Sequence, residues 1–402
     1  MLAACTIVSR NYLHYARTLC ESFLRAYPDG RFFVLVVDRP SAAEPPVVER
    51  FTTVWVEELG IPDFAAIAFK YNILELNTCV KPSFLAWLLD RYGVDRLVYL
   101  DPDTFVYSRM VEVEAILAEA DLVLTPHILA PIQDQKRPAE RDFLLSGVYN
   151  LGFVGVNRRP GSRAFLEWWE RRCLTLGFSD QKAGLFVDQK WIDLAPCLFE
   201  GTRILRHPGY NVAYWNLHER TIDRDGGEFR VNGSAALRFF HFSGIDLGAR
   251  EQLSKYQDRH SLVQRADLRP LFDGYRESVA ASGVTESAKA RYAFDYFSNG
   301  ARINELTRRV YAAGLDKFAG ADPFDASGPF YAFARARGLL SASSGPPPVV
   351  VRPDADDVRV RTIGLVLRAL LRVLGPDRYA LLMKYLAHIS LLRNQRSLFW
   401  RE

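Results

Sequence analysis

Short apolar runs alternate with stretches of helical spacing along the first 250 residues. The apolar runs predict strands at residues 4–8, 31–38, 53–56 and 96–100. Continuous apolar strands separated by helices are typical of a parallel sheet that is covered on both faces. The sequence therefore predicts an α/β domain with an open, Rossmann-like sheet.

Helical spacing fills most of the positions between these strands. It predicts a helix over residues 12–26, which ends before the turn-forming Tyr27-Pro28-Asp29-Gly30. Residues 64–92 are also expected to be largely helical, with Pro82 opening a new helix. In such a fold, ligands bind beyond the carboxyl ends of the strands. The polar residues expected there are Ser9, Asp38, Asp101 and Asp103.

The pattern changes after about residue 265, where helical spacing continues without strands. Helices are predicted at 268–281, 288–297 and 303–313. A Ser-, Gly- and Pro-rich segment then predicts a linker. The expected organisation is an α/β domain at 1–265, a helical extension at 266–340, a linker at 341–357 and a helical tail at 358–402.

Composition and charge exclude several classes of protein. Apolar residues make up 49% of the 402-residue chain, which is enough for a large core, and the net charge of +4 is too small to indicate nucleic-acid binding. The cysteine count is odd and no CxxC pair occurs, which argues against a disulfide framework or a zinc site. We expect reduced thiols in a cytosolic protein, at Cys5, Cys20, Cys79, Cys173 and Cys197. Neither a signal peptide nor an eighteen-residue apolar run is visible.

Two acidic residues follow the fourth predicted strand. Asp101 and Asp103 flank Pro102 directly after Leu97-Val98-Tyr99-Leu100. In extended backbone, residues two apart point the same way, and two carboxylates on one side repel each other unless a cation lies between them. Mg²⁺ and Mn²⁺ accept oxygen ligands and commonly bridge carboxylates to phosphates. The alternative is a loop with solvated aspartates.

A third metal ligand is predicted far downstream. His241 ends the apolar run Leu237-Arg238-Phe239-Phe240 and is followed by a turn of small residues that includes Gly244. A neutral imidazole suits Mn²⁺. A core histidine bonded to the backbone is the alternative.

Together these residues resemble the retaining GT-A glycosyltransferases of family 8, which include glycogenin and lipopolysaccharide galactosyltransferases. The resemblance covers about residues 1–260. It implies a GT-A fold, a nucleotide-diphosphate-sugar donor, with UDP favoured, and Mn²⁺ or Mg²⁺. It also implies that Asp103 is the stronger metal ligand, that Asp101 bridges the metal and the ribose, and that His241 and Gly244 match the family's HxxG motif.

Other segments match the family in the correct order. By resemblance, Lys81 approaches the donor phosphates, and Asp188-Gln189 is the family's Asp-Gln pair. The remaining matches belong to the first nucleotide loop and to the strand beside the donor sugar: Thr6, Ser9, Asn11 and Tyr12, and then Asn150 and Gly152. One departure concerns the lysine that usually follows the HxxG motif and contacts the diphosphate. No lysine stands there, so Arg250 or Lys255 is expected to replace it.

The chemistry of sugar transfer assigns further roles. Breaking a sugar–phosphate bond leaves negative charge on the diphosphate, which a divalent ion and Lys81 would stabilise. The positive charge that develops on the sugar ring needs a carboxylate or amide oxygen, for which Asp188 and Gln189 are the candidates. Whether Asp188 attacks the sugar or only orients it stays open. An N-cap role for Asp188 is compatible with either.

Acceptor contacts are predicted in two places. One is the aromatic and amide-rich segment 210–218, although Tyr214 and Trp215 could equally belong to the core. The other is a polar loop over 130–146, which is either a lid or a plain surface loop. The acceptor candidates are His127, Tyr210, Asn211, Trp215 and His218.

The tail 358–400 is basic, leucine-rich and ends in Phe399-Trp400. It is expected either to lie on an anionic membrane or to form a helical hairpin packed against the protein or a partner. The sequence thus predicts a glycosyltransferase of cell-surface glycan synthesis with a saccharide or lipid-linked acceptor. A sugar nucleotidyltransferase would need a Gly-rich basic loop where Ser9-Arg10-Asn11-Tyr12 stands. An inert glycan-binding scaffold is the third alternative.

Overall fold

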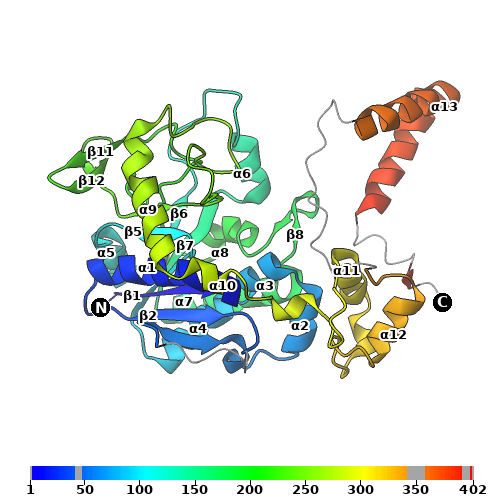
Figure 1. Ribbon diagram of the computed structural model, residues 1–402, viewed down its shortest axis with the longest axis horizontal. Coiled ribbons are helices and arrows are strands. Elements are labelled where there is room, and N and C mark those ends of the chain that lie inside the picture. The colour runs from blue at the N-terminus through cyan, green and yellow to red at the C-terminus, as the bar shows by residue number, and fades with distance from the viewer. Residues whose placement is uncertain (1, 41–47, 342–357, 392–398, 401–402) are drawn as a thin grey trace. The chain divides into compact units, whose positions relative to one another are not determined.

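A seven-stranded, mostly parallel sheet organises the first part of the chain. The computed structural model describes residues 2–40, 48–341, 358–391 and 399–400. The strand order is β10-β6-β7-β4-β1-β2-β3, and β7 alone among these strands runs antiparallel to its neighbours. The strands are β1 (Leu2–Val8), β2 (Phe32–Val36), β3 (Thr52–Trp55), β4 (Arg96–Leu100), β6 (Leu122–Pro126), β7 (Tyr149–Asn157) and β10 (Thr202–Ile204) (Figure 1). The predicted α/β class is confirmed.

Helices cover both faces of the sheet, since every residue of β1 and β2 is buried. Helix α4 packs on α7, and α9 and α10 lie beside α1 (Figure 1). The helices of this part are α1 (Leu13–Ala26), α3 (Ile73–Cys79), α4 (Lys81–Arg91), α5 (Val111–Glu119), α6 (Glu140–Ser146), α7 (Pro160–Leu176), α8 (Ala195–Leu198), α9 (Arg269–Ala281) and α10 (Val284–Ser287). Pro82 lies in the first turn of α4, as predicted.

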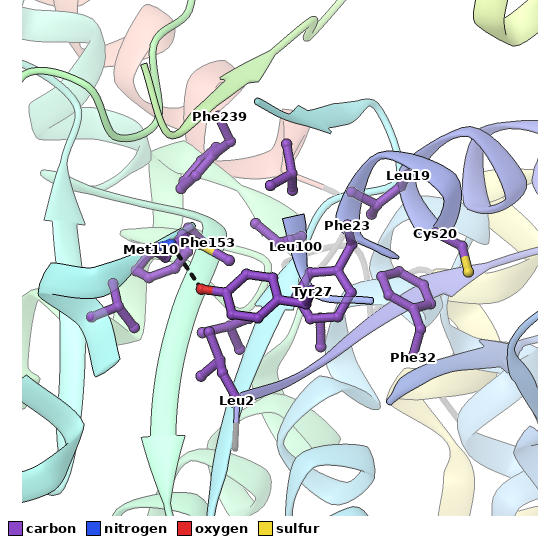
Figure 2. Packing of buried hydrophobic residues seen from close by; sticks show 14 of the residues in the cluster. Leu2, Leu19, Cys20, Phe23, Tyr27, Phe32, Leu100, Met110, Phe153 and Phe239 are labelled. Atoms are coloured by element: carbon purple, nitrogen blue, oxygen red, sulfur yellow. Dashed lines mark hydrogen bonds between the residues drawn. The ribbon is translucent and has the colours of Figure 1, made fainter. Parts of the chain in front are cut away.

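Tyr27 lies at the centre of the core between α1 and the sheet. Its ring stacks on Phe23 at 4.7 Å between centroids, and its hydroxyl accepts a hydrogen bond from the backbone N–H of Met110 at 2.7 Å (Figure 2). The same hydroxyl donates to Glu114 at 2.8 Å. The turn expected at Tyr27 therefore also ties α1 to the N-terminus of α5 through a buried hydroxyl whose hydrogen bonds are satisfied.

The chain divides into two compact units, one of residues 1–64 and 73–293 and the other of residues 65–72 and 294–402. The second unit contains α2 (Phe64–Lys70) from its second residue on, α11 (Glu305–Ala313), α12 (Pro329–Ala336) and α13 (Val358–Ser390). Buried Arg308 donates to the carbonyls of Ala68, Phe69 and Tyr71 at the end of α2, where the last carbonyls of a helix have no partner within the helix. The helical character of the C-terminal region is confirmed. The predicted domain boundaries stay a prediction, and the predicted linker lies outside the described residues except for Ser341.

Three sequence-based predictions of local structure are wrong. No helix spans 288–297, because the backbone N–H of Ala293 donates to Asp38 at 3.0 Å instead of continuing a helix, and only a short 3₁₀ turn forms there. The loop expected over 130–146 ends in helix α6 (Glu140–Ser146). Asp188 does not cap a helix, because the following 3₁₀ turn begins at Lys190 with Gln189 as its cap.

Helix α13 contrasts with the rest of the second unit. It contains no buried residue and bends at Gly375, where φ is 72° and ψ is 165°. Trp400, by contrast, stacks on Phe333 at 4.6 Å between ring centroids, and Gly314 leaves room for its indole. The aromatic end of the tail therefore packs on the second unit. None of the described helices has both the length and the apolarity needed to cross a membrane.

Candidate metal centre

A two-stranded pairing brings the distant histidine to the acidic strand end. Strand β14 (Phe239–His241) runs antiparallel to β5 (Thr104–Val106), with His241 opposite Thr104. The Nε2 atom of His241 is consequently 3.0 Å from Oδ1 of Asp103 and 3.6 Å from Oδ2 of Asp101. The three residues predicted as metal ligands thus meet, with one ligand atom of each within 4.8 Å of the others.

The two carboxylates converge through a turn. Strand β4 ends at Leu100, and the N–H of Thr104 donates to the carbonyl of Asp101 at 3.0 Å. The sequence argument from extended backbone is therefore wrong in its premise, although the side chains do lie together. The N–H of Asp101 donates to the carbonyl of Gly152 at 2.8 Å, which fixes the turn against β7.

This donor set fits one divalent cation. Ligand atoms on an octahedral ion with bonds of about 2.1 Å lie about 3–4 Å apart, as the His241–Asp103 and His241–Asp101 distances do. The Tyr99 hydroxyl donates to Oδ1 of Asp101 at 2.7 Å, which leaves Oδ2 for an ion. The carboxylates are 31% and 27% exposed, so further ligands can approach. Two carboxylates and one imidazole suit Mn²⁺ or Mg²⁺.

The electrostatics of the cluster also favour a cation. Burial lowers the pKa of His241, but the neighbouring Asp103 and Asp101 outweigh that effect and leave the pKa above its usual value. The carboxylates thus favour positive charge at this position. A bound divalent ion would take over this compensation.

Two predicted glycines provide room at the centre. A Cβ at Gly152 would lie 2.3 Å from Cε1 of His241, so a larger residue would displace the ring. Gly244 has a φ of 69°, and Ser254 and Tyr256 occupy the space beside it. Both positions therefore require glycine for a close approach, and Gly244 also for its backbone conformation.

Lys81 and Asp188 form a buried ion pair near this centre. Nζ of Lys81 lies 2.6 Å from Oδ2 of Asp188, and both side chains are 2% exposed. Lys81 also donates to the carbonyl of Leu151 at 2.9 Å and lies 4.1 Å from the Tyr99 ring centroid. Burial raises the pKa of Asp188, and Lys81 opposes that rise. Lys81, expected near phosphates, thus has Asp188 as its charged partner.

Gln189 holds the neighbouring backbone. Its Oε1 accepts from the N–H of Leu151 at 3.0 Å, and its Nε2 donates to the carbonyl of Ser146 at 3.0 Å. Together Gln189 and Lys81 occupy both backbone polar groups of Leu151. The predicted Asp188-Gln189 pair therefore supports β7 where that strand passes the metal centre.

The predicted nucleotide loop lies at the carboxyl end of β1. The Ser9 hydroxyl donates to Oδ1 of Asn11 at 2.5 Å, and Thr6 is fully buried. Tyr12 is 46% exposed, and its ring centroid is 5.3 Å from that of Tyr15. Asp38, predicted beside it, is buried, ion-paired with Arg10 at 3.4 Å and bonded by backbone N–H groups. Asp38 therefore already has an ion-pair partner and two backbone donors within the protein.

The two candidates for the missing lysine differ in their surroundings. The N–H of Lys255 donates to the carbonyl of Gly244 at 3.0 Å. Burial and Asp103 raise the pKa of Tyr12, whereas Lys255 lowers it, so Lys255 acts on the same tyrosine as the metal-centre carboxylate. Arg250 instead acts on Arg276 of α9, helping burial to lower its pKa. Of the two, Lys255 is the one whose charge acts on a residue of the predicted nucleotide loop.

The acceptor candidates are placed differently from one another. Trp215 packs edge-on to His241 at 5.1 Å, and its Nε1 finds no hydrogen-bond partner among the described residues. Asn211 and His127 belong to a buried polar network beside the centre. Tyr210 packs in the core and donates to Glu112 at 2.8 Å, and His218 lies 3.1 Å from the carbonyl of Ala130. The last two side chains thus already have partners within the protein.

A clasp that the sequence did not predict holds the loop before α6. Buried Arg259 forms two bonds with the Asp134 carboxylate at 2.8 and 2.9 Å, and it donates to the carbonyls of Lys136 and Pro138. The Asp134 pKa is held well below its usual range by this hydrogen bonding. The sequence analysis also did not predict that Tyr99 bonds to Asp101. Its position two residues before Asp101 on the same strand could have indicated this contact.

Two proteins of Bacillus subtilis are similar to the chain in sequence. No family model matches it. The chain is 24% identical over 293 residues to the uncharacterized protein YfnF of Bacillus subtilis (strain 168), which covers 69% of this chain and 91% of that protein. It is 25% identical over 247 residues to YfnD of the same organism, which covers 60% and 77%.

Solved structures that are similar in part include two glycosyltransferases. The galactosyltransferase LgtC, in complex with donor and acceptor sugar analogs, has 16% identity and a TM-score of 0.40, and the match covers 69% of this chain and 95% of that one. GlyE of Streptococcus pneumoniae TIGR4 has 13% identity and a TM-score of 0.37, and the match covers 77% and 72%.

Proposed function

We propose that the chain is a metal-dependent glycosyltransferase of the GT-A type. It would transfer a sugar from a nucleotide-diphosphate-sugar, with UDP favoured by the family resemblance, to a saccharide or lipid-linked acceptor in cell-surface glycan synthesis. The observation that carries the proposal is the convergence of Asp101, Asp103 and His241, which the sequence singled out, at the carboxyl end of β4. The donor would lie between this cluster and the exposed Tyr12 at the end of β1.

Asp101, Asp103 and His241 would hold Mn²⁺ or Mg²⁺. The ion, when bound, supplies Lewis-acid stabilisation of the charge that builds on the leaving diphosphate. Lys255 would add a cation on the Tyr12 side of the site, in the role of the family's missing lysine. Trp215 is buried, and its indole N–H, which has no hydrogen-bond partner among the described residues, would be the group that engages a sugar hydroxyl.

Substitution on the same face of the sugar is the route that the family resemblance favours. The bond from the anomeric carbon to the diphosphate oxygen breaks as the acceptor oxygen bonds to the same face, and the acceptor proton passes to the leaving phosphate. Asp188 is 2% exposed and 2.6 Å from Lys81. Its charge is therefore already compensated, which supports an orienting role over direct attack on the sugar.

A screen of nucleotide-sugars for Mn²⁺-dependent hydrolysis tests this function. Asp103→Ala should lose the metal-dependent turnover. Asp95→Ala is a matched control, because Asp95 is an exposed carboxylate at the other end of the same strand, paired only with Arg158 among the described residues. Equal turnover by wild type and Asp103→Ala would overturn the metal assignment, and no hydrolysis of any nucleotide-sugar would overturn the transferase.

The tail supports a second part of the proposal, a peripheral position on the cytoplasmic face of a membrane. Helix α13 exposes apolar residues such as Ile363 and Val373, and its basic residues outnumber its one acidic residue, Asp377. Apolar and cationic surface together are attracted to anionic lipid. Sedimentation with vesicles containing anionic lipid, compared with neutral vesicles, tests it. Equal recovery in the supernatant from both would contradict membrane attachment.

A further inference from the structure

Asn211 lies behind the metal centre, on the side of His241 away from the carboxylates. Its Oδ1 is 3.3 Å from Nδ1 of His241, whereas Asp103 is 3.0 Å from Nε2 of the same ring. Asn211 is fully buried and has a φ of 49°, in the left-handed region that asparagine tolerates better than most residues. A buried side chain in an uncommon backbone conformation needs a specific reason to be there.

The orientation of the Asn211 amide follows from a chain of hydrogen bonds that begins at a backbone donor. The N–H of Gly152 donates to Asn150 at 3.1 Å, so the Asn150 atom that accepts it must be the oxygen. That oxygen also faces Asn211 at 3.0 Å, which requires Asn211 to present its NH₂ group. The remaining atom of the Asn211 amide, its oxygen, must then face His241.

This assignment fixes the proton on His241. An amide oxygen accepts but cannot donate, so Nδ1 of His241 must carry the proton. The Nε2 atom is then the ring nitrogen left to face Asp103 and Asp101. Ligating histidines commonly have their second nitrogen held in this way, and losing the outer partner costs about 10–100-fold in metal affinity.

Other contacts stabilise the same arrangement. The NH₂ group of Asn211 also donates to the Thr125 hydroxyl at 3.0 Å, and Asn216 donates to the Asn211 carbonyl at 2.9 Å. The NH₂ group of Asn150 faces Nε2 of His127 at 3.2 Å. Each polar atom of the two amides therefore has a partner. Reversing Asn211 would set its oxygen against that of Asn150, and reversing Asn150 would set its NH₂ group against two other donors.

We propose that Asn150 and Asn211 are positioning residues that set the tautomer and orientation of His241 for a divalent cation. This inference rests on the proposed metal site. It gives Asn150 a part that differs from the donor-sugar contact expected for it, because its oxygen is occupied by Gly152 and Asn211. The N–H of Gly152 thus fixes the orientation of the two side-chain amides, and through them the tautomer of the imidazole.

Mn²⁺ binding to the full chain tests the proposal without any turnover. Free Mn²⁺ is measured by electron paramagnetic resonance during a titration, and pulsed measurements at saturation detect the coordinated imidazole nitrogen. Asn211→Gly removes the amide but suits the positive φ. It should weaken Mn²⁺ binding about 10–100-fold and reduce the nitrogen signal. Asn232→Gly is the matched control, because Asn232 is exposed and has a φ of 52°.

A second variant separates positioning from folding. Asn150→Leu leaves the backbone at Asn211 untouched, but it removes the oxygen that fixes the Asn211 amide, so that amide can reverse. The variant should therefore also weaken Mn²⁺ binding and reduce the nitrogen signal. It decides the matter if Asn211→Gly does not fold by circular dichroism. Wild-type affinity with a full nitrogen signal in the folded variants would overturn the inference. Equal Mn²⁺ binding by wild type and Asp103→Ala would instead overturn the proposed metal site itself.

Discussion

Two charged clusters lie near each other in the first unit: the Lys81–Asp188 pair, and Asp101 and Asp103 with His241. Their negative charges are compensated in opposite ways. Asp188 is buried and has its own cation, Lys81, at 2.6 Å. Asp101 and Asp103 are partly exposed and share only His241 as a basic partner among the described residues. Asp101 also raises the Asp188 pKa, after the larger effects of burial and Lys81, so the two clusters sense each other. The protein neutralises one carboxylate internally and leaves charge at the other cluster for a ligand cation.

The segment Asn150–Gly152 of β7 connects the two clusters. The carbonyl of Leu151 accepts from Lys81, and the carbonyl of Gly152 accepts from the N–H of Asp101. Asn150 reaches His241 through Asn211. A disturbance at either cluster is therefore expected to affect this strand, but with different consequences for stability and for metal binding.

The largest effect should come from breaking the internally compensated cluster. Lys81→Met leaves Asp188 buried without its cation, which should lower the free energy of unfolding by about 3–5 kcal/mol. Urea denaturation measures the loss. The double variant Lys81→Met/Asp188→Leu removes both charges and should recover much of it. A double variant as unstable as the single one would show that packing of the lysine chain, and not its charge, stabilises the site.

Removing a charge at the exposed cluster should have the opposite consequences: a large loss of metal affinity and little change in stability. Asp103→Asn should weaken Mn²⁺ binding about 100-fold, or about 2.7 kcal/mol, by titration calorimetry. Without metal, the same variant should unfold at the same or a slightly higher urea concentration, because a like-charge repulsion is relieved. A marked loss of metal-free stability would mean that the cluster is a structural ion pair with His241.

The sequence predicted the exposed cluster better than the buried one. A strand end marks Asp101 and Asp103, and a second strand end marks His241, so their meeting followed from the general placement of ligands in α/β sheets. The Lys81–Asp188 pair has no comparable local signal. Lys81 opens helix α4, whereas Asp188 lies in an irregular segment, and only the tertiary fold brings them to 2.6 Å.

The errors in predicted secondary structure also arose from contacts between distant parts of the chain. The helix expected at 288–297 is replaced because Asp38 captures the N–H of Ala293, a contact between distant parts of the chain. Periodicity cannot include such competition, since it considers only neighbours along the sequence. Strands β1 and β2 were predicted well because a strand buried on both faces is apolar at every position.

A smaller, pH-dependent effect on stability is expected at His127, whose Nε2 lies 3.2 Å from the side-chain amide of Asn150. Burial lowers the pKa of His127 to about 4, so the folded protein keeps the ring neutral while the unfolded chain binds a proton below its ordinary pKa. Stability is therefore lost as pH falls from about 6.5 towards 4. Between pH 7 and pH 5 the loss from this group is about 2 kcal/mol. Urea denaturation of His127→Gln should show a correspondingly smaller loss over this range, and an unchanged pH dependence would contradict it.

The smallest expected effect is at Tyr99, which contacts both clusters. Its ring lies over Lys81 at 4.1 Å, and its hydroxyl donates to Asp101 at 2.7 Å. Burial raises the Tyr99 pKa well above its usual value, and Asp101 raises it further, so the hydroxyl stays a donor.

Tyr99→Phe keeps the ring over Lys81 and removes only the hydrogen bond that orients Asp101. Mn²⁺ affinity should fall about 5- to 10-fold, or about 1 kcal/mol, in the same calorimetric titration. Because the buried pair keeps its aromatic neighbour, the variant should not reproduce the instability of Lys81→Met, and a loss of that size would show that the hydroxyl serves the buried pair more than the metal centre.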